Sequence, residues 1–176
     1  MTYNMKLTEE PLIDIRDAFF ETLYSKALED QNLILLSADM GAKSFDKFRE
    51  NIPDQIFNIG VAEQNLISLA AGLTLGGKKV ITYGISSFLI HRSRAQIRHD
   101  LCIMNLPVII VGSGPGVVYD YDGPCHHAIE DIATMRCLPG LNIFSPCDQT
   151  SAVSSATSAL DSKSPSYVRL DKGKYS

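Results

Sequence analysis

The chain has 176 residues, of which 45% are hydrophobic and 20% are charged, and it carries a net charge of -4. This length fits one domain that buries about 70% of its unfolded surface, so a real core is expected. The acidic balance, without a basic stripe, argues against a nucleic-acid partner. Five basic residues are split by apolar residues at helical spacing and predict one polar helix face: His91, Arg92, Arg94, Arg98 and His99.

The spacing of the cysteines and the lengths of the hydrophobic runs indicate which metal sites and which cellular compartment to expect. The four cysteines form no CxxC pair, and Cys125-His126-His127 has no further ligands at suitable spacing. Neither a disulfide framework nor a zinc site is therefore expected. Residues 1–10 are polar and lack the apolar core of a signal peptide. No run reaches transmembrane length, so we expect a soluble protein of the reducing cytoplasm.

The first half of the chain alternates predicted helices and strands. Thr8 to Pro11 is typical of a helix start, and apolar residues then recur at helical spacing up to Ala27. Gly76-Gly77 is expected to stop a later helix. The other predicted elements are strands at 33–36, 56–59 and 79–83 and helices at 44–50 and 62–75.

The second half continues the alternation around one long irregular stretch, 112–124, and loops of this length are usually functional. Its glycines match neither a dinucleotide fingerprint nor a P-loop. The remaining predicted elements are a helix within 86–105, helices at 128–138 and 149–160, and strands at 107–111, 141–144 and 167–170. Six short apolar strands between helices predict a single α/β domain, 1–176, built as a three-layer α/β/α sandwich around a mostly parallel sheet.

Residues 59–65 are the most informative segment. They follow a short apolar strand and open an Ala/Leu-rich helix, which places Glu63 in the first turn of that helix. Ligands of open α/β sheets bind beyond the carboxyl ends of the strands, and a helix amino terminus favours an ionised acid. For an isolated glutamate, complementing the helix dipole is the simpler interpretation. The residues downstream favour a catalytic one.

Taken together, the chain resembles the pyrimidine-binding domain of the thiamine-diphosphate-dependent transketolase family. Between residues 12 and 172 the matching stretches occur in collinear order: SAD (37–39), FNIGVAEQN (57–65), AAGL (70–73), SSFL (86–89), DGPCHHAIED (122–131), RCLP (136–139) and SPCD (145–148). Deoxyxylulose-phosphate synthase shares several of these stretches. The resemblance implies the thiamine-diphosphate-binding fold.

The resemblance also implies roles at the cofactor. Glu63 matches the glutamate that touches N1′ of the aminopyrimidine and favours the imino tautomer, which can remove the thiazolium C2 proton for attack on a ketose. Phe88 matches the aromatic residue that stacks on this ring. His91, one helical turn later, either lines the same wall or lies on the surface. Asp39 either points toward cofactor or substrate or satisfies backbone amides of its own loop.

The resemblance also implies a second group of residues, which contact the substrate. Asp122 and His126 match residues that contact sugar hydroxyls, and His127 is expected to cap the helix that follows. Lys172 occupies roughly the place of a phosphate-binding arginine, without the bidentate fork that an arginine offers. The loop that begins Gly112-Ser113-Gly114 lacks the cation that many relatives place there. Whether the acceptor is a sugar or a sugar phosphate stays open.

The diphosphate half of the cofactor site is not recognisable in the sequence. The family signals it by Gly-Asp-Gly and a later Asn, and the family's carboxyl-terminal domain is not recognisable either. We therefore expect the small subunit of a split transketolase, in an α2β2 heterotetramer whose separate diphosphate-binding subunit holds Mg²⁺ or Ca²⁺. The alternatives are the β part of a 2-oxoacid dehydrogenase E1, a deoxyxylulose-phosphate-synthase-like enzyme, a non-catalytic partner-binding module, and an excised domain of a longer enzyme.

Overall fold

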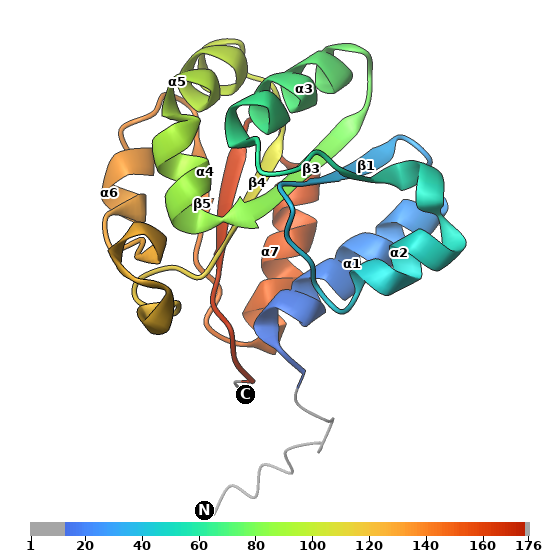
Figure 1. Ribbon diagram of the computed structural model, residues 1–176. Coiled ribbons are helices and arrows are strands. Elements are labelled where there is room, and N and C mark those ends of the chain that lie inside the picture. Colours follow the sequence, from blue (N-terminus) through green and yellow to red (C-terminus); the bar gives the residue numbers. More distant parts are fainter. Residues whose placement is uncertain (1–12, 175–176) are drawn as a thin grey trace, which may run out of the picture.

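The computed structural model describes residues 13–174, which fold around a six-stranded sheet with the order β2-β1-β3-β4-β6-β5 (Figure 1). Every neighbouring pair of strands is parallel, so the predicted three-layer α/β fold is confirmed. Because the strands run one way, their carboxyl ends share one edge. The strands are β1 (Leu33–Ser37), β2 (Ile56–Asn58), β3 (Lys79–Ile85), β4 (Ile109–Ser113), β5 (Asn142–Phe144) and β6 (Ser166–Leu170).

Helices cover both faces of this sheet (Figure 1). One face carries α1 (Ile15–Glu29), α2 (Phe45–Asn51) and α7 (Gln149–Asp161). The other carries α3 (Glu63–Leu75), α4 (Ser86–Arg92), α5 (Arg94–Gln96), a π-helix, η2 (Ile97–Ile103), and α6 (Asp131–Met135). Short 3₁₀ turns are η1 (Pro53–Gln55), η3 (Asp120–Asp122) and η4 (Pro124–His126). No helix of residues 13–174 is long and apolar enough to cross a membrane.

The central strands are buried on both faces, which explains their continuous apolar sequence. In β1, Leu33 and Leu35 pack into the layer under α1, α2 and α7, whereas Ile34 and Leu36 pack into the layer under α3. All four side chains are buried. Polar catalytic groups therefore have room only beyond the strand ends.

The two ends of the described chain are tied together next to the sheet. Helix α1 begins at Ile15, where the Asp14 side chain accepts a hydrogen bond from the Arg16 backbone at 2.9 Å. The backbone of Ile15 donates to the Gly173 carbonyl at 2.9 Å, and Gly173 donates to the Asp14 carboxylate at 3.1 Å. The helix start predicted at Thr8 to Pro11 lies outside the described residues.

The segment 86–105 contains helix, as predicted, but the structure divides it at Ser93 into α4, α5 and the π-helix. The Ser93 hydroxyl donates to the Leu89 carbonyl one turn earlier, a bond that competes with the backbone ladder and bends helices. The predicted single polar face is wrong for the same reason. Arg92 bonds to α3, whereas Arg94 Nη2 lies 3.2 Å from the Cys137 sulfur.

The helix predicted at 128–138 is also shorter than expected, since only Asp131–Met135 is helical. Ala128 is held extended by an antiparallel bridge to Gly116, with backbone hydrogen bonds of 2.8 and 2.9 Å. The prediction that His127 caps this helix is wrong. Glu130 precedes the first turn, and His127 Nε2 is buried without a hydrogen-bond partner among the described residues.

Candidate active site

Glu63 is the first residue of α3 and lies at the carboxyl edge of the sheet with only 5% of its side chain exposed. Arg92 Nη1 donates to both carboxylate oxygens, each at 3.0 Å. Within residues 13–174, this guanidinium is the only side chain that donates to Glu63. A cavity of about 410 Å³ opens beside the pair, lined by Val61, Ala62, Glu63, Gln64, Asn65 and Arg92. A buried carboxylate needs such a partner, because burial without one is costly.

The turn from β2 into α3 is fixed by a pair of polar side chains. Asn58 donates to the Asp39 carboxylate at 2.9 Å and accepts from the Asp39 backbone at 3.0 Å. The same Asn58 oxygen accepts from the backbone of Gly60, which has a φ of +79°. Asp39 therefore lies at the predicted edge but supports the turn before Glu63 through Asn58. Its exposed carboxylate is not among the residues that line the cavity.

Phe88 lies next to this ion pair. The Arg92 guanidinium carbon is 3.9 Å from the centre of the Phe88 ring, close enough for a cation–π contact. The two residues are four apart on α4, a spacing that places side chains on one helix face. Arg92 therefore touches both the acid and the aromatic ring of the predicted cofactor site.

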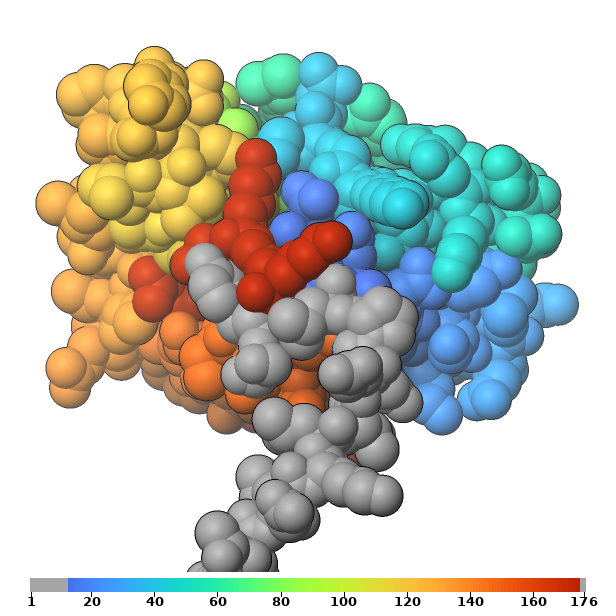
Figure 2. All heavy atoms as spheres, turned by 90° about the horizontal axis from the view of Figure 1, so that it is seen from below, coloured from blue at the N-terminus to red at the C-terminus, as the bar shows by residue number. Residues whose placement is uncertain are grey.

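A continuous row of rings and cations extends across the carboxyl edge, and we call it the ring row. Its members, in spatial order, are Arg92, Phe88, His126, Tyr119 and Lys172. The His126 ring lies 4.8 Å from Phe88 and 6.1 Å from Tyr119, edge-on in both contacts. Lys172 Nζ lies 4.3 Å from the centre of the Tyr119 ring. The predicted residues Phe88, His126 and Lys172 are thus brought together, although they come from three distant parts of the chain. Figure 2 shows the end of β6, in red, between the loop after β4, in yellow, and the blue-to-cyan region of α1 and α2.

Gly112, in β4, and Gly114, just after it, leave room for neighbouring side chains. Gly114 has a φ of +72°, and a Cβ there would lie 2.0 Å from the Tyr119 ring. A Cβ on Gly112 would lie 2.6 Å from the Ser86 hydroxyl. Tyr119 also forms a hydrogen bond of 3.0 Å with the Ser113 hydroxyl. The loop is therefore a packing surface for Tyr119.

Two predicted site residues lie apart from Glu63. His91 Nε2 is 3.1 Å from the Glu130 carboxylate in a half-exposed pair, and His91 is not among the residues lining the cavity. Asp122 is exposed, and its backbone carbonyl lies 3.1 Å from His126 Nδ1. Asp122 therefore orients His126 through its main chain.

Sequence reasoning missed Arg92 and Tyr119 as members of the site. The spacing of Arg92 from Phe88 could have identified it, since i,i+4 neighbours on a helix share a face. Tyr119 has no such local signal, because its contacts with Gly114, His126 and Lys172 are all set by the tertiary fold.

A second acid–arginine pair lies at the same edge of the sheet. The Asp131 side chain is 2% exposed, and its Oδ2 accepts from Arg169 Nε at 2.7 Å and from the Tyr167 hydroxyl at 3.1 Å. Its Oδ1 accepts from the Ile132 backbone at 2.8 Å. Burial, reinforced by the nearby Asp131 carboxylate, raises the pKa of the Tyr167 hydroxyl, so this tyrosine remains a neutral donor.

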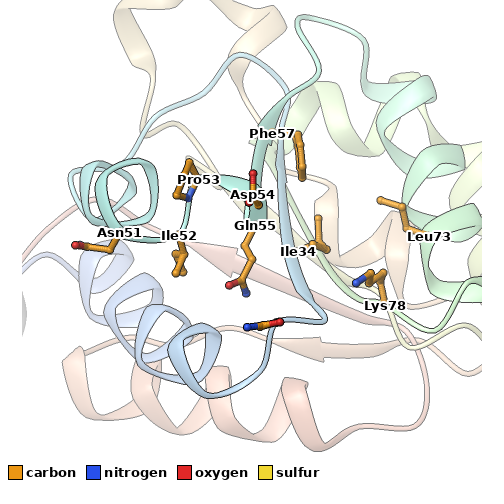
Figure 3. Close-up of a pocket in the computed structure, with 10 residues that line it drawn as sticks. Ile34, Asn51, Ile52, Pro53, Asp54, Gln55, Phe57, Leu73 and Lys78 are labelled. Carbon is orange, nitrogen blue, oxygen red and sulfur yellow. The ribbon is translucent and has the colours of Figure 1, made fainter.

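A larger cavity, of about 550 Å³, lies at the opposite end of the strands (Figure 3). Phe57, Leu73 and Lys78 line its side, and Gln55 lies at its floor. Gln55 donates to three backbone carbonyls, those of Ala27, Asp30 and Leu33. Because its polar floor is satisfied within the fold, this cavity is the weaker candidate for chemistry.

The described residues offer no metal centre. In the range 13–174, no three His, Cys, Asp or Glu side chains are grouped so that they could hold a metal ion. Cys125 Sγ lies 3.3 Å from His126 Nδ1, which is a hydrogen-bond contact beside the ring row.

Comparison with known proteins identifies the family. Residues 12–176 match the family described as transketolase, pyrimidine binding domain. The chain is 34% identical over 162 residues to one of the subunits of the apulose-4-phosphate transketolase of Phocaeicola vulgatus, covering 92% of this chain and 52% of that protein. It is 37% identical over 156 residues to the 1-deoxy-D-xylulose-5-phosphate synthase of Desulfotalea psychrophila, covering 88% of this chain and 24% of that protein. It thus spans about half the length of the first relative.

Solved structures agree with this assignment. A split gene transketolase in an inactive β4 tetramer superposes with a TM-score of 0.81 at 32% identity, covering 93% of this chain and 52% of that chain. The transketolase of Campylobacter jejuni shares the fold, with a TM-score of 0.83 at 20% identity over 93% of this chain and 27% of that chain. The family match covers almost the whole sequence, and the chain therefore belongs to the transketolase family as a pyrimidine-binding domain, in a family that depends on thiamine diphosphate.

Proposed function

We propose that this chain is the pyrimidine-binding subunit of a split transketolase, which transfers two-carbon ketol units between sugars. The observation that carries the proposal is the Glu63 carboxylate, buried at the start of α3 and facing a cavity that is also lined by Arg92, which stacks on Phe88. The similarity to the apulose-4-phosphate transketolase of Phocaeicola vulgatus and to the split gene transketolase supports the same assignment.

The residues present fit the aminopyrimidine ring of thiamine diphosphate. The guanidinium of Arg92 stands in for that ring: it is flat, its N–H group donates to Glu63, and it lies 3.9 Å from the centre of the Phe88 ring. The space between Glu63 and Phe88 therefore accepts a planar nitrogen group that is bonded on one side and stacked on the other. Thiamine diphosphate, when bound, supplies the nucleophilic carbon that carries the ketol unit.

Each residue has a defined part in this proposal. Glu63 holds a proton at N1′ of the ring, from a side chain that is only 5% exposed at the start of α3. Phe88 orients the ring by stacking. His126 contacts substrate hydroxyls, with Asp122 holding its ring. Lys172, over Tyr119, provides a positive charge for an acidic or phosphorylated substrate.

Asp39 and His91 belong to the outer part of the cofactor site. Asp39 supports the turn before Glu63 through its two hydrogen bonds with Asn58. His91 pairs with Glu130, which directly precedes α6, and borders the site on that side. Both act in the proposed enzyme by holding the walls, and neither donates to Glu63.

We infer that the diphosphate is held through Mg²⁺ or Ca²⁺ by a separate polypeptide, in an α2β2 heterotetramer. Large apolar side chains exposed around the site support a protein interface there, namely Val61, Tyr121 and Ile129. The active site would then lie between two different polypeptides. The four free cysteines fit the reducing cytoplasm, where we place the complex.

Replacement of Glu63 by Gln tests the proposal. In the complex co-purified with its native partner, Glu63→Gln should lower the rate of ketol transfer by about 10²–10⁴-fold, the usual effect of losing a general acid–base group. Glu29→Gln, on the exposed end of α1, is the control and should leave the rate unchanged. Activity retained by Glu63→Gln would contradict the catalytic role.

A deoxyxylulose-phosphate-synthase-like reaction is the second candidate, favoured by the 37% identity to the Desulfotalea psychrophila enzyme. The donor substrate separates the two functions. A transketolase complex consumes ketose sugars, whereas a synthase consumes a 2-oxoacid and releases CO₂. Release of labelled CO₂ from pyruvate by the purified complex, without turnover of ketoses, would favour the synthase.

A further inference from the structure

Arg92 already occupies both contacts that the proposed function assigns to the cofactor ring. Its Nη1 donates to both oxygens of Glu63 at 3.0 Å, and its guanidinium carbon lies 3.9 Å from the centre of the Phe88 ring. A second planar group cannot bond to the same carboxylate and stack on the same ring face while the guanidinium stays there. The side chain and the aminopyrimidine therefore exclude each other.

We propose that Arg92 is an internal competitor of the cofactor: it fills the aminopyrimidine place in the cofactor-free chain and swings out when thiamine diphosphate binds. This inference rests on the proposed function, because it requires that Glu63 and Phe88 form the pyrimidine site. It assigns Arg92 to the control of cofactor affinity. Arg92 is not assigned to the chemistry.

The geometry of the pair suits a displaceable contact. A tight arginine–carboxylate pair uses two parallel N–H groups from two nitrogens, whereas here one nitrogen serves both oxygens. The Arg92 side chain is 46% exposed, so water can receive the guanidinium when it leaves Glu63. Arg92 is also the last residue of α4, directly before the break at Ser93.

The same contact explains how the chain tolerates its buried acid without the cofactor. The Glu63 side chain is 5% exposed, and an unpaired charge at such burial is strongly destabilising. Arg92 supplies the missing cation and orients the carboxylate through its two contacts of 3.0 Å. When the ring arrives, it takes over the hydrogen bond and the stack. The apparent affinity of the cofactor is then lowered by the fraction of sites that Arg92 occupies.

Cofactor affinity tests the proposal directly. In the complex co-purified with its native partner, the dissociation constant for thiamine diphosphate in the presence of Mg²⁺ is measured by calorimetry for wild type, Arg92→Ala and Arg92→Gln. We expect Arg92→Ala to bind about tenfold more tightly, which corresponds to a competitor that fills about nine sites in ten. Arg92→Gln keeps one donor for Glu63 and should be intermediate, and it carries the test if Arg92→Ala fails to fold.

The matched control is Arg98→Ala, which removes the same charge from an exposed arginine beside His99 in the π-helix. It should leave the dissociation constant unchanged. Weaker or unchanged binding by Arg92→Ala would overturn this inference and leave the proposed function standing. Absence of binding in wild type and every variant would overturn the proposed function and the inference with it.

A second readout uses the chain without its partner. In ¹⁵N-arginine-labelled protein, the Arg92 guanidinium signal, assigned by its loss in Arg92→Ala, should shift in Glu63→Gln and remain unshifted in Glu29→Gln. If the Arg92 signal does not shift in Glu63→Gln, the proposed contact between Arg92 and Glu63 is wrong, whatever affinity the complex has for the cofactor.

Discussion

Two buried acids, each paired with an arginine, lie at the carboxyl edge of the same sheet, and they differ in how completely the acid is bonded. Asp131 accepts from the Arg169 side chain, the Tyr167 hydroxyl and the Ile132 backbone, and Arg169 is only 20% exposed. Glu63 accepts from one nitrogen of Arg92, which is 46% exposed, and a cavity opens beside the pair.

The difference separates a structural pair from an exchangeable one. A buried polar network in which every group is satisfied becomes rigid and costs much to break, because each partner would be left unpaired. The Asp131 network has this character. The Glu63 pair has a single donor that can return to water, so another donor can replace it. A buried acid with an exposed partner and a cavity is thus the better candidate for chemistry.

The largest expected effect comes from matched amide substitutions in the two pairs. Asp131→Asn removes the charge that pairs with Arg169 and turns one of the two accepting oxygens into an NH₂ donor, so it should cost about 3 kcal/mol of unfolding free energy. For a chain of this length, that lowers Tm by roughly 6–12 °C. Glu63→Gln should cost about 1 kcal/mol or less, because Arg92 is half-exposed and can turn to water.

Urea denaturation of the two variants beside wild type measures this difference. Equal losses in both variants would show that the two pairs are equally structural. The distinction drawn from their bonding would then be wrong.

The loop after β4 supports a second, smaller effect. Gly114→Ala requires alanine at a φ of +72° and a Cβ 2.0 Å from the Tyr119 ring, so we expect a loss of about 2 kcal/mol. Gly72→Ala is the control, since Gly72 is exposed in α3 and a Cβ there would meet nothing within 4 Å. It should stabilise the chain by about 0.5–1 kcal/mol. Opposite signs in urea denaturation are the expected outcome, and a neutral Gly114→Ala would show that Tyr119 does not need the glycine.

The sequence predicted those parts of the fold that depend on local pattern. Helix α3, predicted at 62–75 and observed at Glu63–Leu75, follows from a strand, a turn and an apolar helix that Gly76-Gly77 ends, within twenty-odd residues. Gly77 has a φ of +88°, as expected for a glycine just past a helix end. The strands were predicted for the same reason, since burial on both faces makes them continuously apolar.

The parts that were not predicted depend on contacts between distant segments. Ser93 ends α4 by bonding to Leu89, although serine is tolerated in many helices. Ala128 stays extended because it pairs with Gly116. Tyr119 joins the site through Gly114 and Lys172, which no spacing rule connects. Glu63 itself was identifiable from the local sequence. Its partner Arg92 could be identified only by noting that it shares a helix face with Phe88.

Phe88→Leu tests the ring row as part of the exchangeable site. Leucine keeps the apolar volume but loses the stack, which contributes about 0.5–1.5 kcal/mol, so cofactor affinity in the complex should fall about 2- to 13-fold. Phe57→Leu is the matched control, since Phe57 is half-exposed on β2 and lines the distant cavity (Figure 3). Calorimetry with thiamine diphosphate and Mg²⁺ measures both. A larger loss in Phe57→Leu would move the candidate site to that cavity.

The cysteines offer a similar contrast between exposed and buried groups, and here the expected effect is a difference in thiol reactivity. Burial raises the pKa of the Cys102 thiol to about 11, whereas Cys125, Cys137 and Cys147 are exposed. The thiolate is the reactive form, and with this pKa about one Cys102 in a thousand is ionised at pH 8. A disulfide reagent at pH 8 should therefore titrate three thiols in the native chain and the fourth only after unfolding.

Cys102→Ala assigns the slow thiol, because that variant should show three thiols in both states. Four thiols reacting at one rate in the native wild type would contradict the burial of Cys102 against α3. The reaction of Cys125 adds a local probe, since its sulfur lies 3.3 Å from His126 in the ring row. A molecule that fills the space beside His126 should slow Cys125 and leave Cys147 unchanged, whereas binding in the cavity of Figure 3 should slow neither, because neither thiol lines it.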